Sequence, residues 1–226
     1  MRYALSFSGG KDSTLALDRA TRQGLDVAYL FNIFEGSTGR VRFHGIQAQL
    51  IAAQAESMGI PLIQDSTSPD DYETVFVRLL DRFRRQGIGG IIFGNIHLAD
   101  IRAWYEERTR GHGFEHVEPL WGASGLELVQ EVIDRGYVAS VVSVDLSRTP
   151  DAWLGRTLDP SLLVEIKARP DVDPCGERGE YHTFVRNGPL FQRPIDVQLG
   201  QRIEMEGHAL IEVTSAPGQR DVLLSR

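Results

Sequence analysis

A glycine-rich turn near the beginning of the chain limits the possible folds more than any other feature. Its sequence is SFSGGKDST, residues 6–14. The apolar run at 2–7 predicts a buried strand before it, and the periodic stretch at 11–23 predicts a helix after it. In an open parallel sheet, such a turn directs backbone N–H groups and the positive end of a helix at an anion. We therefore expect an α/β chain that holds a phosphate group here.

Strand and helix signals alternate through the first half of the chain. The helix that ends before Gly87 is the most clearly marked, with Ser68 as its expected N-cap and Pro69 at its first position. Apolar runs separated by helices of this length imply parallel strands joined by crossover helices, hence a doubly wound parallel sheet with helices on both faces. The other expected elements are strands at 26–33, 61–65 and 89–95 and a helix at 45–58.

The pattern changes after about residue 115. Ser124 and Glu127 form an expected capping box at the start of a helix, and a buried strand is expected at 137–145. Short alternating runs follow, with Asn-Gly at 187–188 as a hairpin signal and further strand pairs expected within 202–215. The sequence thus predicts a smaller, mixed α+β C-terminal part.

Composition restricts the environment and the partners. Apolar residues make up 42% of the 226-residue chain, enough for a sizeable core, and the first residues are too short an apolar run for a signal peptide. The single cysteine, Cys175, excludes an internal disulfide and a multi-cysteine metal site. The net charge of −7 argues against stable nucleic-acid binding. We expect a cytoplasmic protein with no membrane partner.

The residue types of the turn suit polyphosphate chemistry. Two glycines let the backbone approach a phosphate, two serines add hydroxyl donors, a lysine adds positive charge and an aspartate is placed to hold Mg²⁺. The turn matches neither G-x-x-x-x-G-K-[ST] nor G-x-G-x-x-G. A tight glycine turn without a ligand is the alternative, and the whole string at a strand–helix junction favours the phosphate site. The residues concerned are Ser8, Gly9, Gly10, Lys11, Asp12 and Ser13.

Longer motifs resemble a known family. SGGKDS resembles the pyrophosphatase loop (PP-loop) of the N-type ATP pyrophosphatases. The segments FHGIQAQLIAAQAESMGIPL, FGNIHLADIRAWYEERTRGHGFEHVEPLWG and DPCGERGEYHTFV resemble the diphthine–ammonia ligase family over nearly the whole chain. The resemblance implies a Rossmann-like, HUP-type PP-loop domain that binds ATP at 1–118 and a substrate-binding domain at 119–226.

The resemblance also implies an ATP-dependent carboxylate–ammonia ligase. A substrate carboxylate would attack the α-phosphorus of ATP and release pyrophosphate, and ammonia would then displace AMP to leave an amide. The implied cofactors are ATP and Mg²⁺, with Asp12 as the metal ligand and Asn32 beside the adenine. The implied catalytic residues are Lys11, Asp12, Glu177, Glu180 and His182. The implied acceptor-site residues are His44, Asn95, Arg102, Glu177, Glu180, His182 and Thr183.

Several residues have a second interpretation. From spacing alone, Glu177 and Glu180 suit exposed turn residues, and only the full signature favours a site. Asn95 departs from the Asp that the family usually carries, which changes the charge at that position. His112 and His116 have the i, i+4 spacing of a metal pair, but no third ligand is apparent and a solvated loop is the favoured interpretation.

The acceptor and the assembly stay open. The resemblance implies the diphthine of elongation factor 2 as acceptor in an archaeon or a eukaryote, and a different carboxylate, such as a small metabolite, in a bacterium. A PP-loop enzyme that thiolates tRNA and a non-catalytic ATP sensor are alternative functions. The strand-rich C-terminal segment offers an edge for a homodimer.

Overall fold

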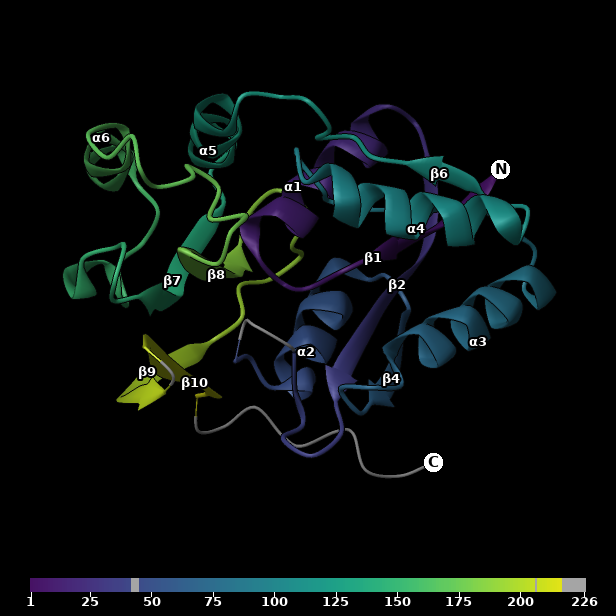
Figure 1. Cartoon of the computed structure of the whole chain (residues 1–226), viewed down its shortest axis with the longest axis horizontal. Coiled ribbons are helices and arrows are strands. Elements are labelled where there is room, and N and C mark those ends of the chain that lie inside the picture. The colour runs from purple at the N-terminus through teal and green to yellow at the C-terminus, as the bar shows by residue number, and fades with distance from the viewer. Residues whose placement is uncertain (42–44, 206, 217–226) are drawn as a thin grey trace.

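The first sheet has the expected doubly wound topology (Figure 1). The computed structural model describes residues 1–41, 45–205 and 207–216. Five strands run parallel in the order β4-β2-β1-β5-β6, so that the winding reverses between β1 and β5. The strands are β1 Arg2–Ser6, β2 Asp26–Glu35, β4 Leu62–Thr67, β5 Ile88–Ile92 and β6 Glu115–Val117, and β3 Arg40–Val41 pairs antiparallel with the end of β2. The predicted fold class is confirmed.

Helices cover both faces of this sheet because its strands are apolar on both sides. Along β1, Leu5 belongs to a core cluster that also contains Leu15 of α1 and Leu50 of α2. The neighbouring Ala4 belongs to a second cluster that contains Phe76 of α3 and has Trp104 of α4 packed against it. Successive side chains of a strand point to opposite faces, so each pair of helices covers one face. The helices are α1 Lys11–Arg22, α2 Ala48–Met58, α3 Tyr72–Arg85 and α4 Ala99–Gly111.

The second sheet is antiparallel, in the order β8-β7-β10-β9. The expected strand pair within 202–215 is confirmed as the β9–β10 hairpin. β9 lies at the outer edge, where Leu199, Ile203 and Met205 are exposed, and a homodimer at this edge stays a prediction. The elements are α5 Gly125–Asp134, β7 Val138–Asp145, the 3₁₀ turn η1 Asp151–Trp153, α6 Pro160–Lys167, β8 Tyr181–Asn187, β9 Val197–Met205 and β10 His208–Ser215.

The hairpin predicted at Asn187-Gly188 is wrong. β8 pairs with β7, and no strand occupies 189–196. A Cβ on Gly188 would lie 2.1 Å from the ring of Tyr137, so glycine is needed here for close packing. Ile195 then enters the core at 2% exposure and donates its backbone N–H to Arg186 O at 2.8 Å. The chain after β8 therefore packs into the core and does not fold back as a strand.

Two predicted helix starts also differ. α3 begins at Tyr72 with Asp71 as N-cap, because the Ser68 hydroxyl donates to Asp71 Oδ2 at 2.7 Å and the intervening residues form a turn. α2 begins at Ala48, since Gln47 forms an isolated bridge with Arg40. Ser124 is the N-cap of α5 as predicted, but its side chain makes no capping hydrogen bond.

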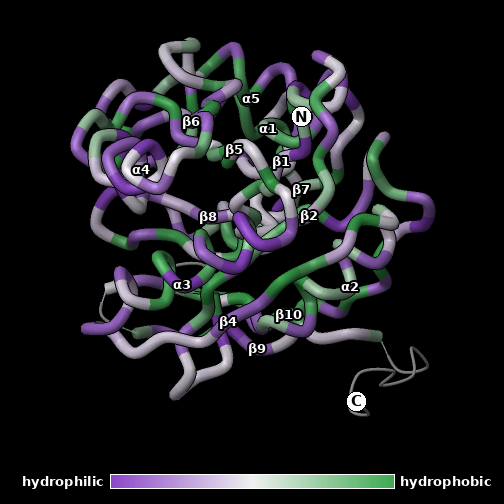
Figure 2. Tube along the Cα trace, turned by 90° about the vertical axis from the view of Figure 1, so that its right-hand side faces the viewer, coloured by the Kyte–Doolittle hydropathy of each residue, from purple (hydrophilic) through white to green (hydrophobic). Residues whose placement is uncertain are grey.

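The two sheets share one core. The first cluster joins Leu15 and Leu17 of α1 to Val141 of β7 and Phe184 of β8. Figure 2 shows hydrophobic strand segments running through the interior, while α4 at the periphery is largely hydrophilic. The domain boundary at 118/119 stays a prediction, and both sides of it contribute to a common interior.

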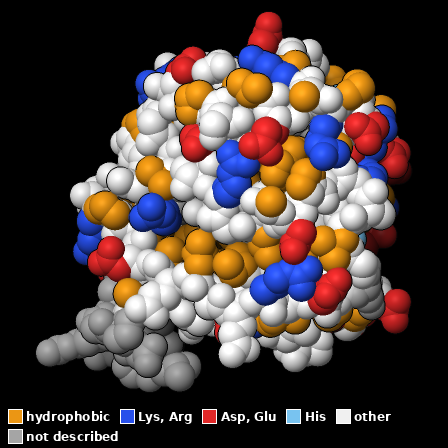
Figure 3. Space-filling view, turned by 90° about the vertical axis from the view of Figure 1, so that its left-hand side faces the viewer, with side chains coloured by type: hydrophobic (Ala, Val, Ile, Leu, Met, Phe, Trp, Pro, Cys, Tyr) orange, Lys and Arg blue, Asp and Glu red, His pale blue; other side chains and the backbone are white. Residues whose placement is uncertain are grey.

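The surface and the helices add two observations. On the face that carries α6 and β9, Lys and Arg side chains are interspersed with Asp and Glu (Figure 3). Two ion pairs join residues of this part of the chain: Arg156 pairs with Glu165 of α6, and Arg202 of β9 pairs with Asp151 of η1. Within the described ranges, no helix combines the length and the apolar character needed to cross a bilayer.

Candidate active site

The glycine turn between β1 and α1 is held rigidly from two sides. Gly9 has φ +80°, and a Cβ there would lie 2.4 Å from Gln54 Oε1 and 2.5 Å from Ile51 Cδ1. Its carbonyl accepts hydrogen bonds from Gln54 Nε2 at 2.9 Å and from the backbone N–H of Val185 at 3.0 Å. The turn therefore keeps one conformation, which only glycine adopts without strain.

The beginning of α1 presents unused donors. Gly10 is the N-cap and supplies no side chain to cap the helix. The N–H of Lys11 donates to Thr183 Oγ1 at 3.0 Å, whereas helix geometry leaves those of Asp12 and Ser13 without an intrahelical acceptor. The hydroxyls of Ser8 and Ser13 lie 3.2 Å apart beside them. Such a helix end, with its positive dipole, fits a phosphate group.

Lys11 joins this turn to the segment that precedes β8. Its side chain is 2% exposed, and its ammonium donates to Asp12 Oδ2 at 2.9 Å and to the carbonyl of Cys175. The same ammonium lies 4.8 Å from the centre of the Tyr181 ring. Burial alone would lower the pKa of Lys11, but the charge of Asp12, the Tyr181 and Cys175 groups and the hydrogen bond to Asp12 together outweigh this effect, so the pKa is raised. The buried cation is therefore paired with one carboxylate and one backbone carbonyl.

Two further carboxyl groups lie near Asp12. Asp173 Oδ2 lies 3.1 Å from His97 Nε2, which follows β5. The Glu177 carboxyl accepts a hydrogen bond from the backbone N–H of Ile96. Burial raises the pKa of Glu177 to about 7, and the negative charges of Asp12 and Asp173 add to this effect. Glu177 is therefore not an exposed turn residue, and its proton is exchangeable near neutral pH.

Glu180 is enclosed by the loop that it belongs to. It is 1% exposed, and its Oε1 accepts from the backbone N–H of Asp173 at 3.2 Å and from Arg148 Nη1 at 3.0 Å. Its Oε2 accepts from the backbone N–H of Arg178 at 3.0 Å. Both oxygens thus hold the 173–180 loop in shape. The interpretation of Glu180 as an exposed turn residue is wrong.

β8 brings only some of the signature residues to the turn. Tyr181 and Thr183 both contact Lys11, so they share one face of the strand. Strand alternation points His182 to the opposite face. Cys175 is buried, its thiol donates to Gly125 O at 3.4 Å, and burial raises its pKa, as expected of a cysteine that serves packing.

A second polar group lies at the carboxyl ends of β5 and β6. Asn95 Nδ2 donates to Glu118 Oε1 at 2.8 Å, and His116 Nε2 lies 3.0 Å from the same oxygen. Arg102 Nε lies 3.3 Å from Glu118 Oε2. Gly94 connects the group to the turn, because a Cβ there would lie 3.2 Å from the backbone of Asp12. The structure thus brings Asn95 and Arg102 together beside the phosphate-type turn.

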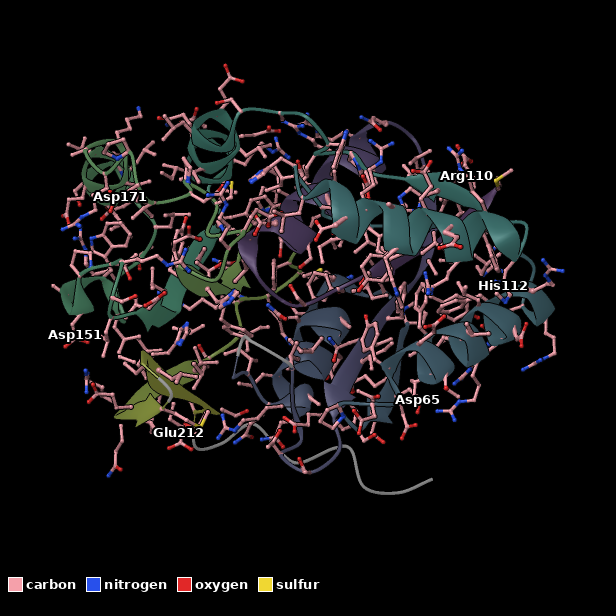
Figure 4. The ribbon with its side chains drawn as sticks, in the orientation of Figure 1. Asp65, Arg110, His112, Asp151, Asp171 and Glu212 are labelled. Carbon is pink, nitrogen blue, oxygen red and sulfur yellow. The ribbon has the colours of Figure 1, made fainter. Side chains whose placement is uncertain are left out.

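Sequence reasoning missed Glu118 and misjudged His116. The side chain of His116 is 1% exposed and that of Glu118 is 3% exposed, so the predicted solvated loop is wrong. His112 instead bonds to the carbonyl of Arg108, near the outer end of α4 (Figure 4). Within the described ranges, no group of three or more His, Cys, Asp or Glu side chains could hold a metal ion. The position of Glu118 directly after β6 is the signal that could have identified it.

Two predicted site residues remain, Asn32 on the strand next to β1 and His44, which lies outside the described residues. Asn32 Nδ2 donates to Phe7 O at 3.0 Å, while its Oδ1 is buried without a partner. This orphan acceptor, one strand away from the turn, is compatible with a neighbouring ligand donor.

Comparison with known proteins identifies the family. The chain is 27% identical to the diphthine–ammonia ligase of Bos taurus, covering 94% of this chain and 89% of that protein. It is also 27% identical to the human diphthine–ammonia ligase, covering 87% and 83%. A solved structure, described as a predicted subunit of a tRNA methyltransferase from Methanocaldococcus jannaschii, aligns with TM-score 0.49 and 14% identity over 84% of this chain and 100% of that one.

Two domain profiles account for most of the chain. The diphthamide synthase N-terminal domain matches residues 1–116, and the diphthamide synthase C-terminal domain matches residues 124–216. The resemblance seen in the motifs is confirmed: this chain belongs to the diphthamide synthase family.

Proposed function

We propose that this protein is an ATP-dependent ligase that adenylates a carboxylate and converts it to an amide with ammonia. The observation that carries the proposal is the junction between the glycine turn and the 173–183 segment, where Lys11 bonds to Cys175 O and Thr183. This junction brings a phosphate-type turn close to Glu177, a carboxyl group with a pKa of about 7. Family membership and the names of the relatives support the same reaction.

ATP would occupy the turn. The N–H groups at the start of α1 and the hydroxyls of Ser8 and Ser13 would donate to its phosphates, with Gly9 and Gly10 allowing the close approach. Asn32, one strand away, would lie beside the adenine. Asp12 would hold Mg²⁺ together with phosphate oxygens, and the ion would supply charge neutralisation as pyrophosphate leaves.

The protein residues then position the reactants. An oxygen of the acceptor carboxylate attacks the α-phosphorus, the bond to the bridging oxygen breaks, and pyrophosphate leaves. Ammonia next attacks the acyl carbon, AMP leaves and the nitrogen loses a proton. We assign Glu177 to accept that proton, because its pKa lies near neutrality. Lys11 adds positive charge next to Asp12.

Glu180 and His182 take different roles from Glu177. We assign Glu180 to positioning, because both of its oxygens bond to the 173–180 loop or to Arg148. His182 faces away from Lys11, so we place it outside the group that contacts the reacting atoms. Asn95 and Arg102 would face the acceptor.

The relatives are named for diphthine and ammonia, and diphthine is the first acceptor to test. A small-molecule carboxylate is the second. The test is to incubate the protein with ATP labelled at the α- and γ-phosphates, Mg²⁺, ammonium and an extract of its own organism. The expected products are AMP and pyrophosphate.

Two variants make this test specific. Asp12→Ala removes the proposed metal ligand and is expected to abolish AMP formation. Asp151→Ala changes an exposed carboxylate at the left-hand edge of the molecule (Figure 4) and is expected to retain AMP formation. Formation of ADP and phosphate, or no turnover despite ATP binding, would contradict the proposal.

A further inference from the structure

Arg102 in the first turn of α4 has N–H groups that form no aligned hydrogen bond within the part of the chain that the structure describes. Its guanidinium forms no aligned hydrogen bond with any described residue, and Nε is buried without such a partner. It forms two ion pairs, in which Nε lies 3.3 Å from Glu118 Oε2 and 3.5 Å from Glu106 Oε2. The side chain is 32% exposed, so part of it reaches solvent, while its Nε is buried.

The same guanidinium is nevertheless held in one orientation. Its carbon lies 4.4 Å from the centre of the Trp121 ring. Glu118, which faces its Nε side, is fixed by Asn95 and His116. An arginine stacked on an aromatic ring loses little further freedom on binding a ligand, and its planar fork matches two oxygens of one carboxylate.

We propose that the Nη edge of Arg102, supported by Trp121 and Glu118, binds a planar oxyanion, namely the carboxylate of the acceptor. This inference rests on the proposed function, and it assigns the substrate class to a defined edge of one side chain. Trp121 and Glu118 act as positioning residues, since they touch Arg102 and not the ligand.

The neighbouring charges favour a carboxylate over a nucleotide phosphate. Glu118 and Glu106 flank the guanidinium, so no excess positive charge is present for a polyphosphate. Arg102 belongs to the helix after β5, whereas the turn that suits the phosphates follows β1, and Gly94 brings the two segments next to each other. The Glu118 carboxylate can only accept hydrogen bonds, so the Asn95 side chain turns its Nδ2 toward Glu118. The Oδ1 of Asn95 is then left as an acceptor for an N–H group.

Tryptophan fluorescence tests this proposal on the full chain. Acetate is titrated at constant ionic strength in the presence of Mg²⁺ and α,β-methylene-ATP. We expect a saturable change in tryptophan fluorescence. Its absence in Trp121→Phe would show that the signal comes from the Trp121 ring. In Arg102→Gln we expect acetate to bind at least about tenfold more weakly, because a bidentate charged pair is lost. Arg102→Lys, which keeps the charge without the fork, should fall between the two.

A matched variant and a second ligand separate the possible sources of the oxyanion. Arg85→Gln alters an exposed arginine at the end of α3 and should bind acetate as the wild type does. The affinity for α,β-methylene-ATP should be unchanged in Arg102→Gln. If that affinity falls and acetate binding persists, the oxyanion is the nucleotide phosphate and the inference is overturned.

The inference is also overturned if wild type and Arg102→Gln bind acetate equally well and have equal melting temperatures. The proposed function has an independent readout, because the wild-type protein either forms AMP or does not, whatever Arg102 binds. Should Arg102→Gln fail to fold, the comparison of wild type with Arg102→Lys carries the same decision.

Discussion

At the scale of single residues, Gly176 occupies a position that no other residue can take. It has φ +70°, and a Cβ would lie 2.4 Å from Tyr181 O. We expect Gly176→Ala to lower the free energy of unfolding by about 3 kcal/mol, since left-handed strain and a backbone overlap add. Urea unfolding measures the change. Gly136→Ala is the matched control, because Gly136 has φ +75° with nothing within 4 Å and should lose only about 1 kcal/mol. Equal losses in the two variants would contradict the packing argument.

The pKa of Glu177 predicts how stability depends on pH. Burial raises it from 4.5 to about 7, so the folded state favours the protonated carboxyl. The resulting stabilisation is present below pH 4.5 and is lost as the pH rises through 7. We expect Glu177→Gln, which cannot ionise, to gain about 2–3 kcal/mol relative to the wild type between pH 4.5 and 8. Urea unfolding at several pH values tests this, and parallel curves for the two proteins would disprove the assignment.

At the scale of elements, the loop before β8 depends on Glu180. Its carboxylate accepts from Asp173 N, Arg178 N and Arg148 Nη1. In Glu180→Gln, an NH₂ group replaces one of the two accepting oxygens and faces N–H donors. We therefore expect the free energy of unfolding to fall by about 3 kcal/mol and hydrogen exchange across residues 173–180 to become faster.

The comparison with Glu177→Gln separates the two glutamates. At pH 7 that variant should keep slow exchange in the loop while losing AMP formation. If Glu180→Gln leaves both exchange and melting temperature unchanged, Glu180 is not the positioning residue that we propose.

At the scale of the whole molecule, the common core predicts that the two halves fold together. Leu15 and Leu17 pack in the same cluster as Val141 and Phe184, and Gln54 bonds to both Gly9 O and Val185 O. We expect a fragment of residues 1–118 to lack fixed tertiary structure, because removal of the rest exposes this apolar face to water. Near-ultraviolet circular dichroism checks this, and co-expression with 119–226 should restore the signal. A fragment 1–118 that folds alone would instead support two independent domains.

Local patterns predicted most of the first sheet. Residues 2–7, 11–23 and 26–33 form strand, helix and strand within a few positions of the expected limits. The errors arose where tertiary contacts override local signals. Gly188, for example, lies at a bend where the chain packs against Tyr137, and it does not form the turn of a hairpin.

The candidate site was predicted less completely than the fold. Ser8 to Ser13 form the expected turn, and Asn95 and Arg102 lie together as the motifs suggested. The sequence analysis did not identify Glu118, because its role depends on burial against Asn95 and His116. The spacing of residues along the sequence does not indicate such burial.

By itself, the sequence determined the order of strands and helices, the glycine turn and the family, because these depend on periodicity and on contiguous motifs. Only the tertiary structure decided which signature side chains meet that turn. Lys11 bonds to Thr183 across 172 positions, and the alternation of β8 selects Thr183 while excluding its neighbour His182. Contacts of this kind depend on the packing of one sheet against another, and packing joins residues that no local pattern relates.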